Sequence, residues 1–144
     1  MLHDIPGEKG NVDHVVISTR GVFVVETKAW AKPDRVWQMD FDGKQVHIPN
    51  QAPDPAPIIQ CLAEAASIKR LLRDSTSQDF PVRGVVVFLE WYVKHTPSAR
   101  GSDIWVLNPK QLAGWIRQEP ENLSEADVAM ATLHLKQYVK KLAA

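Results

Sequence analysis

Two runs of β-branched side chains open the hydrophobic pattern of this chain. Residues 12–18 and 22–27 are rich in valine and isoleucine, which favour strands because their branched side chains pack well on a pleated surface. Thr19-Arg20-Gly21 lies between the runs and has the composition of a turn. The pattern therefore predicts a β-hairpin.

A second hairpin of weaker pattern follows, and a proline-rich loop comes after it. Residues 35–39 and 44–48 flank Asp42-Gly43, a residue pair that favours a type I′ turn. Residues 49–57 contain four prolines, which lack a backbone N–H, so this segment is expected to be a loop.

A long amphipathic helix is expected over residues 57–73. Pro57 suits the first helical position, where no intrahelical hydrogen bond is lost. At about 100° per residue, Gln60 falls near one border of the apolar stripe, while Arg70 and Arg73 lie away from its centre. The stripe comprises Ile58, Cys61, Leu62, Ala65, Ile68 and Leu72.

The remaining pattern predicts two strands and two helices. Residues 82–89 are nearly all apolar, as expected of a central strand covered on both faces, and residues 103–107 form a shorter run. Pro109 opens a short helix to about residue 118, and Ser124-Glu125-Ala126-Asp127 has the form of a capping box. The last helix then has apolar positions three and four apart, at Val128, Ala131, Leu135, Tyr138 and Leu142.

The order of these elements predicts an α/β domain with a mixed central sheet flanked by helices, spanning residues 1–144. The 17 basic and 17 acidic residues cancel, which argues against a strongly basic nucleic-acid-binding module more than against a metal-dependent enzyme. No apolar run of about 18 residues spans a membrane, and no signal peptide is recognisable. The single cysteine excludes an internal disulfide, so we expect a cytoplasmic protein.

Three charged residues in the first hairpin are unusual for strands that only have to fold. Glu26 and Lys28 share a face because side chains alternate along a strand. A two-residue loop at Arg20-Gly21 would set Asp13 opposite Lys28 on that face, whereas a three-residue loop without a bulge would turn it to the other face. The sequence leaves both registers open.

Convergence of these charges would create a site for phosphodiester chemistry. Two carboxylates a few ångströms apart repel unless a cation lies between them, and Mg²⁺ prefers such oxygen ligands. The Lys28 ammonium could then orient a water or balance charge on a phosphate. The alternative is that Glu26 and Lys28 form an ordinary solvated pair at a strand end.

The stretch from Gly10 to Lys28 resembles the signature of the nuclease-related domain (NERD) family, a branch of the PD-(D/E)XK, restriction-endonuclease-like superfamily. The resemblance covers about residues 2–88. The matching residues are Asp13-His14, Gly21-Val22-Phe23, Glu26-Thr27-Lys28, Pro57 and Gln60, with a later core strand at 85–88.

This resemblance implies a Mg²⁺- or Mn²⁺-dependent nuclease that hydrolyses phosphodiester bonds in DNA. It assigns Asp13 and Glu26 as metal ligands, with the backbone carbonyl of Thr27 as a third. It further assigns Lys28 as the catalytic lysine and places Gln60 beside the site.

Two departures from the family pattern support a second hypothesis. Family members have a helix before the Asp strand that carries a glutamate; here residues 2–11 are expected to be a loop, so that helix would be lacking. Ala56 stands where the family has Asn before the helix proline. The second hypothesis is therefore a weakly active or inactive module that binds nucleic acid or a partner protein, and a third is a purely structural domain.

Other residues have a structural and a functional interpretation. Alternation puts His14 on the face opposite Asp13, which favours a structural histidine, and Cys61 falls in the apolar stripe as a small core residue. Among the tryptophans, Trp30 is best placed to stack on a base.

A basic group on the long helix could contact a phosphate backbone, although such groups are usually solvated helix faces. It comprises Lys69, Arg70 and Arg73. With Trp30, these residues are the candidates for substrate binding.

Overall fold

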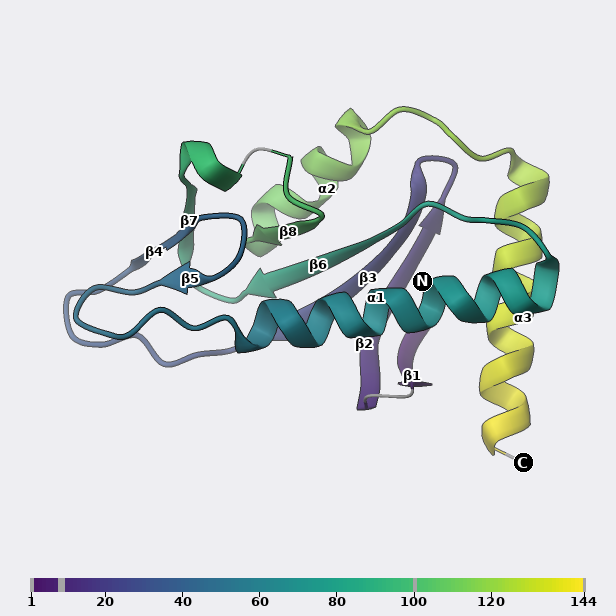
Figure 1. Cartoon of the computed structure of the whole chain (residues 1–144), viewed down its shortest axis with the longest axis horizontal. Coiled ribbons are helices and arrows are strands. Elements are labelled where there is room, and N and C mark those ends of the chain that lie inside the picture. Colours follow the sequence, from purple (N-terminus) through teal and green to yellow (C-terminus); the bar gives the residue numbers. More distant parts are fainter. Residues whose placement is uncertain (1, 8–9, 100, 144) are drawn as a thin grey trace.

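A five-stranded mixed sheet forms the centre of the fold (Figure 1). The computed structural model describes the backbone of residues 2–7, 10–99 and 101–143 and the side chains of residues 14–99 and 101–141. The strand order is β1-β2-β3-β6-β8; β1, β2 and β3 are antiparallel, whereas β3, β6 and β8 run parallel. The strands are β1 (Leu2–Gly7), β2 (Gly10–Ser18), β3 (Gly21–Lys28), β6 (Val82–Phe88) and β8 (Ile104–Leu107).

Helices cover both faces of this sheet. On one face, α1 (Ala56–Thr76) and α3 (Glu125–Ala143) pack against buried residues such as Val24 and against each other. On the other face, α2 (Pro109–Gln118) packs against residues such as Val25. The predicted mixed sheet flanked by helices is confirmed.

The two C-terminal helices begin where predicted, and a side-chain cap precedes each of them. In α2 the Asn108 side chain accepts a hydrogen bond from the Gln111 N–H, and the Gln111 side chain accepts one from the Asn108 N–H. Before α3, Ser124 and Asp127 exchange the equivalent bonds at 3.0 and 2.9 Å. Both pairs satisfy N–H groups that the first helical turn leaves without partners.

A small second sheet has the order β5-β4-β7, with β4 (Gln38–Phe41), β5 (Val46–His47) and β7 (Tyr92–His95). The predicted hairpin exists, but it is shorter than expected because residues 35–37 precede the first strand. Its turn is not a two-residue type I′ turn. Four residues connect the strands, and the Asp42 carboxylate accepts hydrogen bonds from the Lys44 and Gln45 N–H groups.

Two strands were not predicted. Residues 2–7 form β1, which pairs antiparallel with β2, so the loop expected over residues 2–11 is wrong for residues 2–7 and 10–11, whereas residues 8–9 lie outside the described residues. β7 pairs in parallel with β4, and its side chains alternate between exposed and buried. Because this alternation covers only four residues, it does not identify a strand in the sequence.

Helix α1 begins one residue before the predicted start and extends to Thr76. Leu62 was assigned to the apolar stripe, yet it is 39% exposed because the sheet covers a narrower sector of the helix. The exposed Arg70 and Arg73 lie away from the core as predicted. In the described part of the chain, no helix combines the length and apolar character needed to cross a membrane.

Candidate functional site

The β2–β3 hairpin has a two-residue turn, but at a different position from the predicted one. Ser18 pairs with Gly21, so the turn is Thr19-Arg20 rather than Arg20-Gly21. The Ser18 hydroxyl accepts a hydrogen bond from the Arg20 N–H at 3.1 Å, and Gly21 has a φ of +142° that favours glycine. The local chemistry at Ser18 and Gly21 therefore shifts the register by two residues relative to the prediction.

A shift of two residues preserves which positions share a face. His14 pairs with Val25, and continuing the ladder by one residue brings the backbone of position 13 opposite Glu26. Val25 lies on the α2 face, so His14 is on the face opposite Glu26. The Asp13 side chain is outside the described residues, and its convergence with Glu26 and Lys28 stays a prediction.

Glu26 is a buried carboxylate at the end of β3. It is 4% exposed, and its Oε1 has no hydrogen-bond partner. Alternation along β3 places it with Val22 and Val24, which pack against α1. Burial of a carboxylate oxygen without a hydrogen-bond partner is unfavourable, so Glu26 is an exception among buried polar groups that needs an explanation.

Lys28 is half-buried and lies two residues beyond Glu26 on the α1 face. The parallel strand β6 fixes this end of β3, because Glu26 pairs with Val86 and Lys28 with Phe88. The Leu89 N–H also donates to the Lys28 carbonyl at 2.9 Å. The backbone that carries both charges is therefore held on the sheet; Thr27 lies between them, and the role of its carbonyl stays a prediction.

Helix α1 brings two further polar side chains to this end of the sheet. The Lys28 Nζ donates to Gln60 Oε1 at 3.2 Å, and the Gln60 Nε2 donates to Glu64 Oε1 at 3.3 Å. Glu64 is 1% exposed. Lys28 and Gln60 are thus in contact, as expected, whereas Glu64 was not predicted.

A signal for Glu64 was present in the sequence. Its position lies between Cys61 and Ala65 of the apolar stripe, one helical turn after Gln60. A carboxylate inside an apolar stripe is unusual because a buried charge needs compensation. Because Glu64 follows Gln60 by four residues, the helix places its carboxylate on the same side as the glutamine that the family resemblance puts beside the site.

Cys61 is a completely buried core residue, as predicted. Its thiol lies 3.7 Å from the Val24 carbonyl oxygen. Burial raises the pKa of this thiol well above its ordinary range, and the nearby negative charges of Glu64 and Glu26 raise it further.

The expected metal ligands lie only partly among the described side chains. Among the described side chains no group of three His, Cys, Asp or Glu residues could hold a metal ion. The buried Glu26 oxygen is nevertheless the hard, anionic donor that Mg²⁺ prefers. The donor chemistry therefore fits the expected ion, with Asp13 outside the described side chains.

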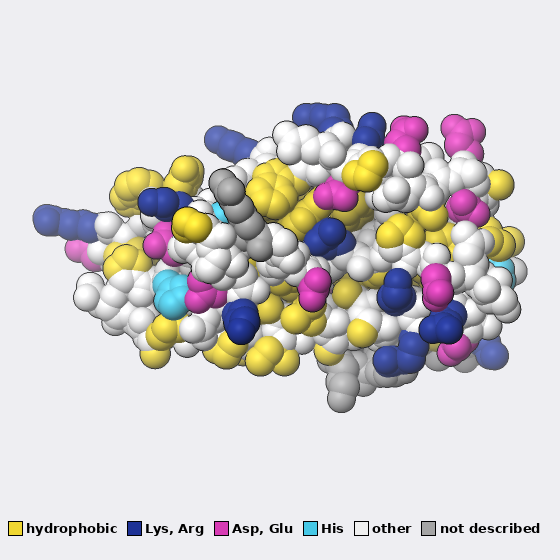
Figure 2. Space-filling view, turned by 45° about the horizontal axis from the view of Figure 1, so that its top comes forward, with side chains coloured by type: hydrophobic (Ala, Val, Ile, Leu, Met, Phe, Trp, Pro, Cys, Tyr) yellow, Lys and Arg dark blue, Asp and Glu magenta, His cyan; other side chains and the backbone are white. Residues whose placement is uncertain are grey.

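Basic residues on α1 have partners on the protein itself. The Lys69 Nζ donates to the Phe80 carbonyl at 2.7 Å, and Arg73 lies 3.5 Å from Asp79. Acidic and basic side chains are interspersed over the face shown in Figure 2. Substrate contacts by Lys69, Arg70 and Arg73 stay predictions.

Trp30 lies just beyond the end of β3. Its ring packs edge-on against Phe88 with the centroids 4.9 Å apart, and its carbonyl accepts a hydrogen bond from the Trp91 indole at 3.0 Å. Trp30 is half-buried and also lines a cavity of about 430 Å³ with Gln51 and Asp54. The contact of Trp30 with a substrate stays a prediction.

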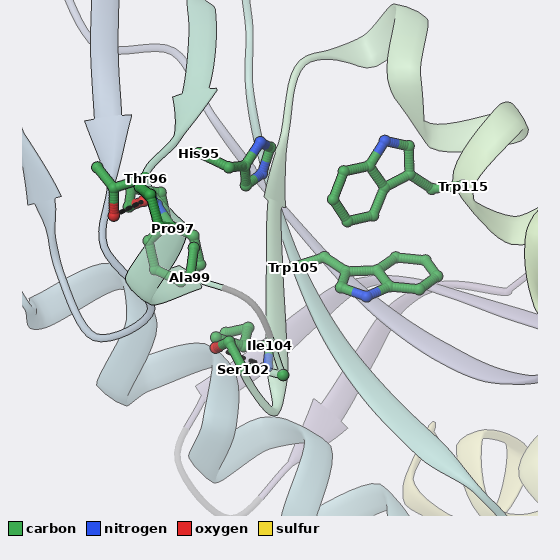
Figure 3. Close-up of a pocket in the computed structure, with 10 residues that line it drawn as sticks. His95, Thr96, Pro97, Ala99, Ser102, Ile104, Trp105 and Trp115 are labelled. Carbon is green, nitrogen blue, oxygen red and sulfur yellow. Dashed lines mark hydrogen bonds between the residues drawn. The ribbon is translucent and has the colours of Figure 1, made fainter.

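A separate aromatic cavity of about 420 Å³ lies beside the edge strand β8 (Figure 3). The Trp115 ring approaches His95 at 5.0 Å and Trp105 at 5.3 Å between centroids, and the His95 Nε2 donates to the Val106 carbonyl. Neither Glu26 nor Lys28 lines this cavity. Its rings contact one another and extend the core at the sheet edge.

Residues 1–89 match the model of a family described as nuclease-related domain. The chain belongs to the nuclease-related domain (NERD) family. The PD-(D/E)XK superfamily and an α/β nuclease-like core are consistent with this membership and with the observed fold.

The NERD match contains every residue of the polar cluster described above, from Glu26 to Glu64. Strand β8 and helices α2 and α3 follow the matched stretch. No curated protein and no solved structure matches the chain significantly.

Proposed function

We propose that this NERD domain hydrolyses phosphodiester bonds in DNA with the help of Mg²⁺ or Mn²⁺. The observation that carries the proposal is the buried Glu26 oxygen without a hydrogen-bond partner, two residues from Lys28 at the end of β3. A structural carboxylate at 4% exposure would be expected to have its oxygens paired. A bound cation is the simplest group that would pair it.

Each residue has a separate task in this proposal. Glu26 and Asp13 would hold the cation, with the Thr27 carbonyl as a further ligand. The cation would lower the pKa of a bound water and stabilise charge on the phosphate. Lys28 orients the attacking water and offsets the negative charge that develops on the phosphate oxygens, while Gln60 holds the lysine ammonium in place.

DNA would reach the site along the end of β3. The exposed Arg70 and Arg73 of α1 would contact the phosphate backbone, and Trp30 would stack on a base beside the cleaved bond. The net charge of the chain is zero, so its overall electrostatic attraction to a polyanion is small. We therefore expect weak DNA binding in the absence of the divalent ion.

Cleavage of supercoiled and linear DNA with and without Mg²⁺ or Mn²⁺ tests this proposal. We expect ion-dependent cleavage that falls by about 100-fold or more in Lys28→Ala, since one group stabilising transition-state charge commonly contributes that much. Lys94→Ala is the matched control, because Lys94 is an exposed strand lysine of the second sheet. Equal cleavage by Lys28→Ala and the parent would indicate contamination and overturn the proposal.

Manganese binding measured by calorimetry provides a readout that does not depend on cleavage. Glu26→Gln should lose the ion and remain at least as stable as the metal-free parent, because it removes a buried charge that lacks a partner. Ion binding and DNA binding without cleavage would instead favour the non-cutting module. Unchanged ion binding in Glu26→Gln would exclude the assigned ligand.

A further inference from the structure

A continuous chain of hydrogen bonds connects the surface-facing lysine of the site to a buried acid on α1. It runs from Lys28 Nζ to Gln60 Oε1 and from Gln60 Nε2 to Glu64 Oε1. Gln60 and Glu64 are four residues apart, so they lie one above the other on the same side of the helix. The chain therefore crosses from β3 to α1 through a single amide.

The groups at the two ends of this series of hydrogen bonds, on Lys28 and Glu64, determine the orientation of the Gln60 side-chain amide. An ammonium only donates hydrogen bonds, and an ionised carboxylate only accepts them. Gln60 must therefore turn its oxygen to Lys28 and its NH₂ group to Glu64. Rotation of the amide by 180° would place an NH₂ group against the ammonium and an oxygen against the carboxylate, which is unfavourable at both ends.

Burial makes Glu64 an effective anchor for Gln60. Glu64 is 1% exposed and lies between buried residues of α1 such as Cys61 and Ala65, whereas Gln60 itself is exposed. An exposed glutamine samples several rotamers, and ordering it has an entropic cost. A fixed acceptor one turn along the helix selects the rotamer that reaches Lys28.

We propose that Glu64 is a positioning residue of the site, which fixes the Gln60 amide and through it the Lys28 ammonium. This inference rests on the proposed nuclease function, because it gives Glu64 a part in that reaction. Glu64 does not contact the substrate. It acts through Gln60 and determines how often Lys28 is oriented for catalysis.

The hydrogen-bonded series Lys28–Gln60–Glu64 is called the relay below. A double-mutant cycle, in which DNA cleavage is measured, tests it. Gln60→Ala and Glu64→Met should each lower kcat by about 10- to 100-fold, the usual effect of removing a partner that orients a functional group. The KM for DNA should stay unchanged, because neither residue binds the substrate. The double variant should be no worse than Gln60→Ala alone, since Glu64 acts only through Gln60. A double variant whose loss in kcat equals the product of the two single losses would overturn the relay.

Two other variants separate positioning from structural and charge effects. Glu64→Gln keeps a carbonyl that accepts from Gln60 and should retain more activity than Glu64→Met. Asp74→Asn removes one negative charge from an exposed position of the same helix and should leave kcat unchanged. A loss in Glu64→Gln as large as in Glu64→Met would overturn the relay.

Side-chain amide signals in ¹H–¹⁵N NMR spectra test the relay in the protein without metal or DNA. In the parent the two Gln60 NH₂ protons should be distinct and slow to exchange, because one is bound to Glu64. Glu64→Met should shift these signals and accelerate their exchange, while Asp74→Asn should not. Unchanged Gln60 signals in Glu64→Met would overturn the relay even if cleavage is observed. Absence of cleavage in the parent together with the expected shifts would contradict the nuclease proposal and support the contact.

Discussion

Glu26 and Lys28 could be identified from the sequence as candidate site residues, because alternation along a strand places both charges on one face. Their burial and contacts depend on α1, which the hairpin sequence does not contain. Gln60 was predicted through the family resemblance and does contact Lys28. Glu64 was missed because the apolar stripe was defined by its hydrophobic members, although the helix buries the carboxylate among them.

Cys61 offers a test at the residue scale of how tightly this part of α1 is packed. Its thiol is fully buried, and burial together with Glu64 and Glu26 raises the thiol pKa, so the reactive thiolate is strongly disfavoured. We expect iodoacetamide at pH 8 to leave the folded protein unmodified and to alkylate it rapidly in denaturant. Mass spectrometry of the intact protein measures the difference. Rapid alkylation under native conditions would show that α1 separates from the sheet.

At the scale of elements, segments with a clear hydrophobic pattern were predictable, whereas strands β1 and β7 were not. Helix α1 and strand β6 have strong patterns and lie where expected. The strands β1 and β7 are short and gain their stability from pairing with β2 and β4, which is a property of the neighbouring strand. The hairpin turn was misplaced because its position depends on hydrogen bonding by Ser18.

Gly84 permits the close approach of α1 to β6 that brings Gln60 and Glu64 near β3. A Cβ at Gly84 would lie 3.0 Å from the Cys61 Sγ and 3.4 Å from the Cys61 carbonyl oxygen. Gly84→Ala should therefore displace the helix and lower the free energy of unfolding by about 1–3 kcal/mol, the usual effect of overpacking. Cleavage should fall as well, because the displaced helix carries the relay.

The matched control is Gly114→Ala in α2. The nearest atom to its added Cβ is 4.0 Å away, so this change should raise stability by about 0.5–1 kcal/mol through helix propensity. Urea unfolding followed by circular dichroism measures both variants. Equal stability of the two would contradict the steric role of Gly84.

At the scale of the whole molecule, the family match and the folded unit have different extents. The match ends at residue 89, yet Leu123, Ala131 and Leu135 belong to the same buried cluster as Val24 of β3. The C-terminal helix therefore supports the face of the sheet on which the candidate site lies. Its amphipathic pattern was predictable, but its packing partner was not.

A pair of leucines on α3 tests this support. Leu135 is fully buried and Leu133 is 54% exposed. Leu135→Ala should lower the free energy of unfolding by about 3 kcal/mol, whereas Leu133→Ala should change it by less than about 0.5 kcal/mol. Thermal unfolding measured by calorimetry gives both values. Similar effects of the two changes would show that α3 does not pack as described.

The link from α2 to α3 is attached at the tip of the β2–β3 hairpin, where the Thr19 carbonyl accepts hydrogen bonds from the Asn122 and Leu123 N–H groups at 2.8 Å. Glu26 and Lys28 lie at the opposite end of β3, roughly 20 Å away at the usual rise per residue. The exposed segment Pro120-Glu121 in this link is thus a suitable insertion point for a fluorescent protein or an affinity tag. A protein fused there would lie away from the end of β3 that carries Glu26 and Lys28, and a long polymer could still approach that end. The domain could therefore be tethered without a change to these two residues.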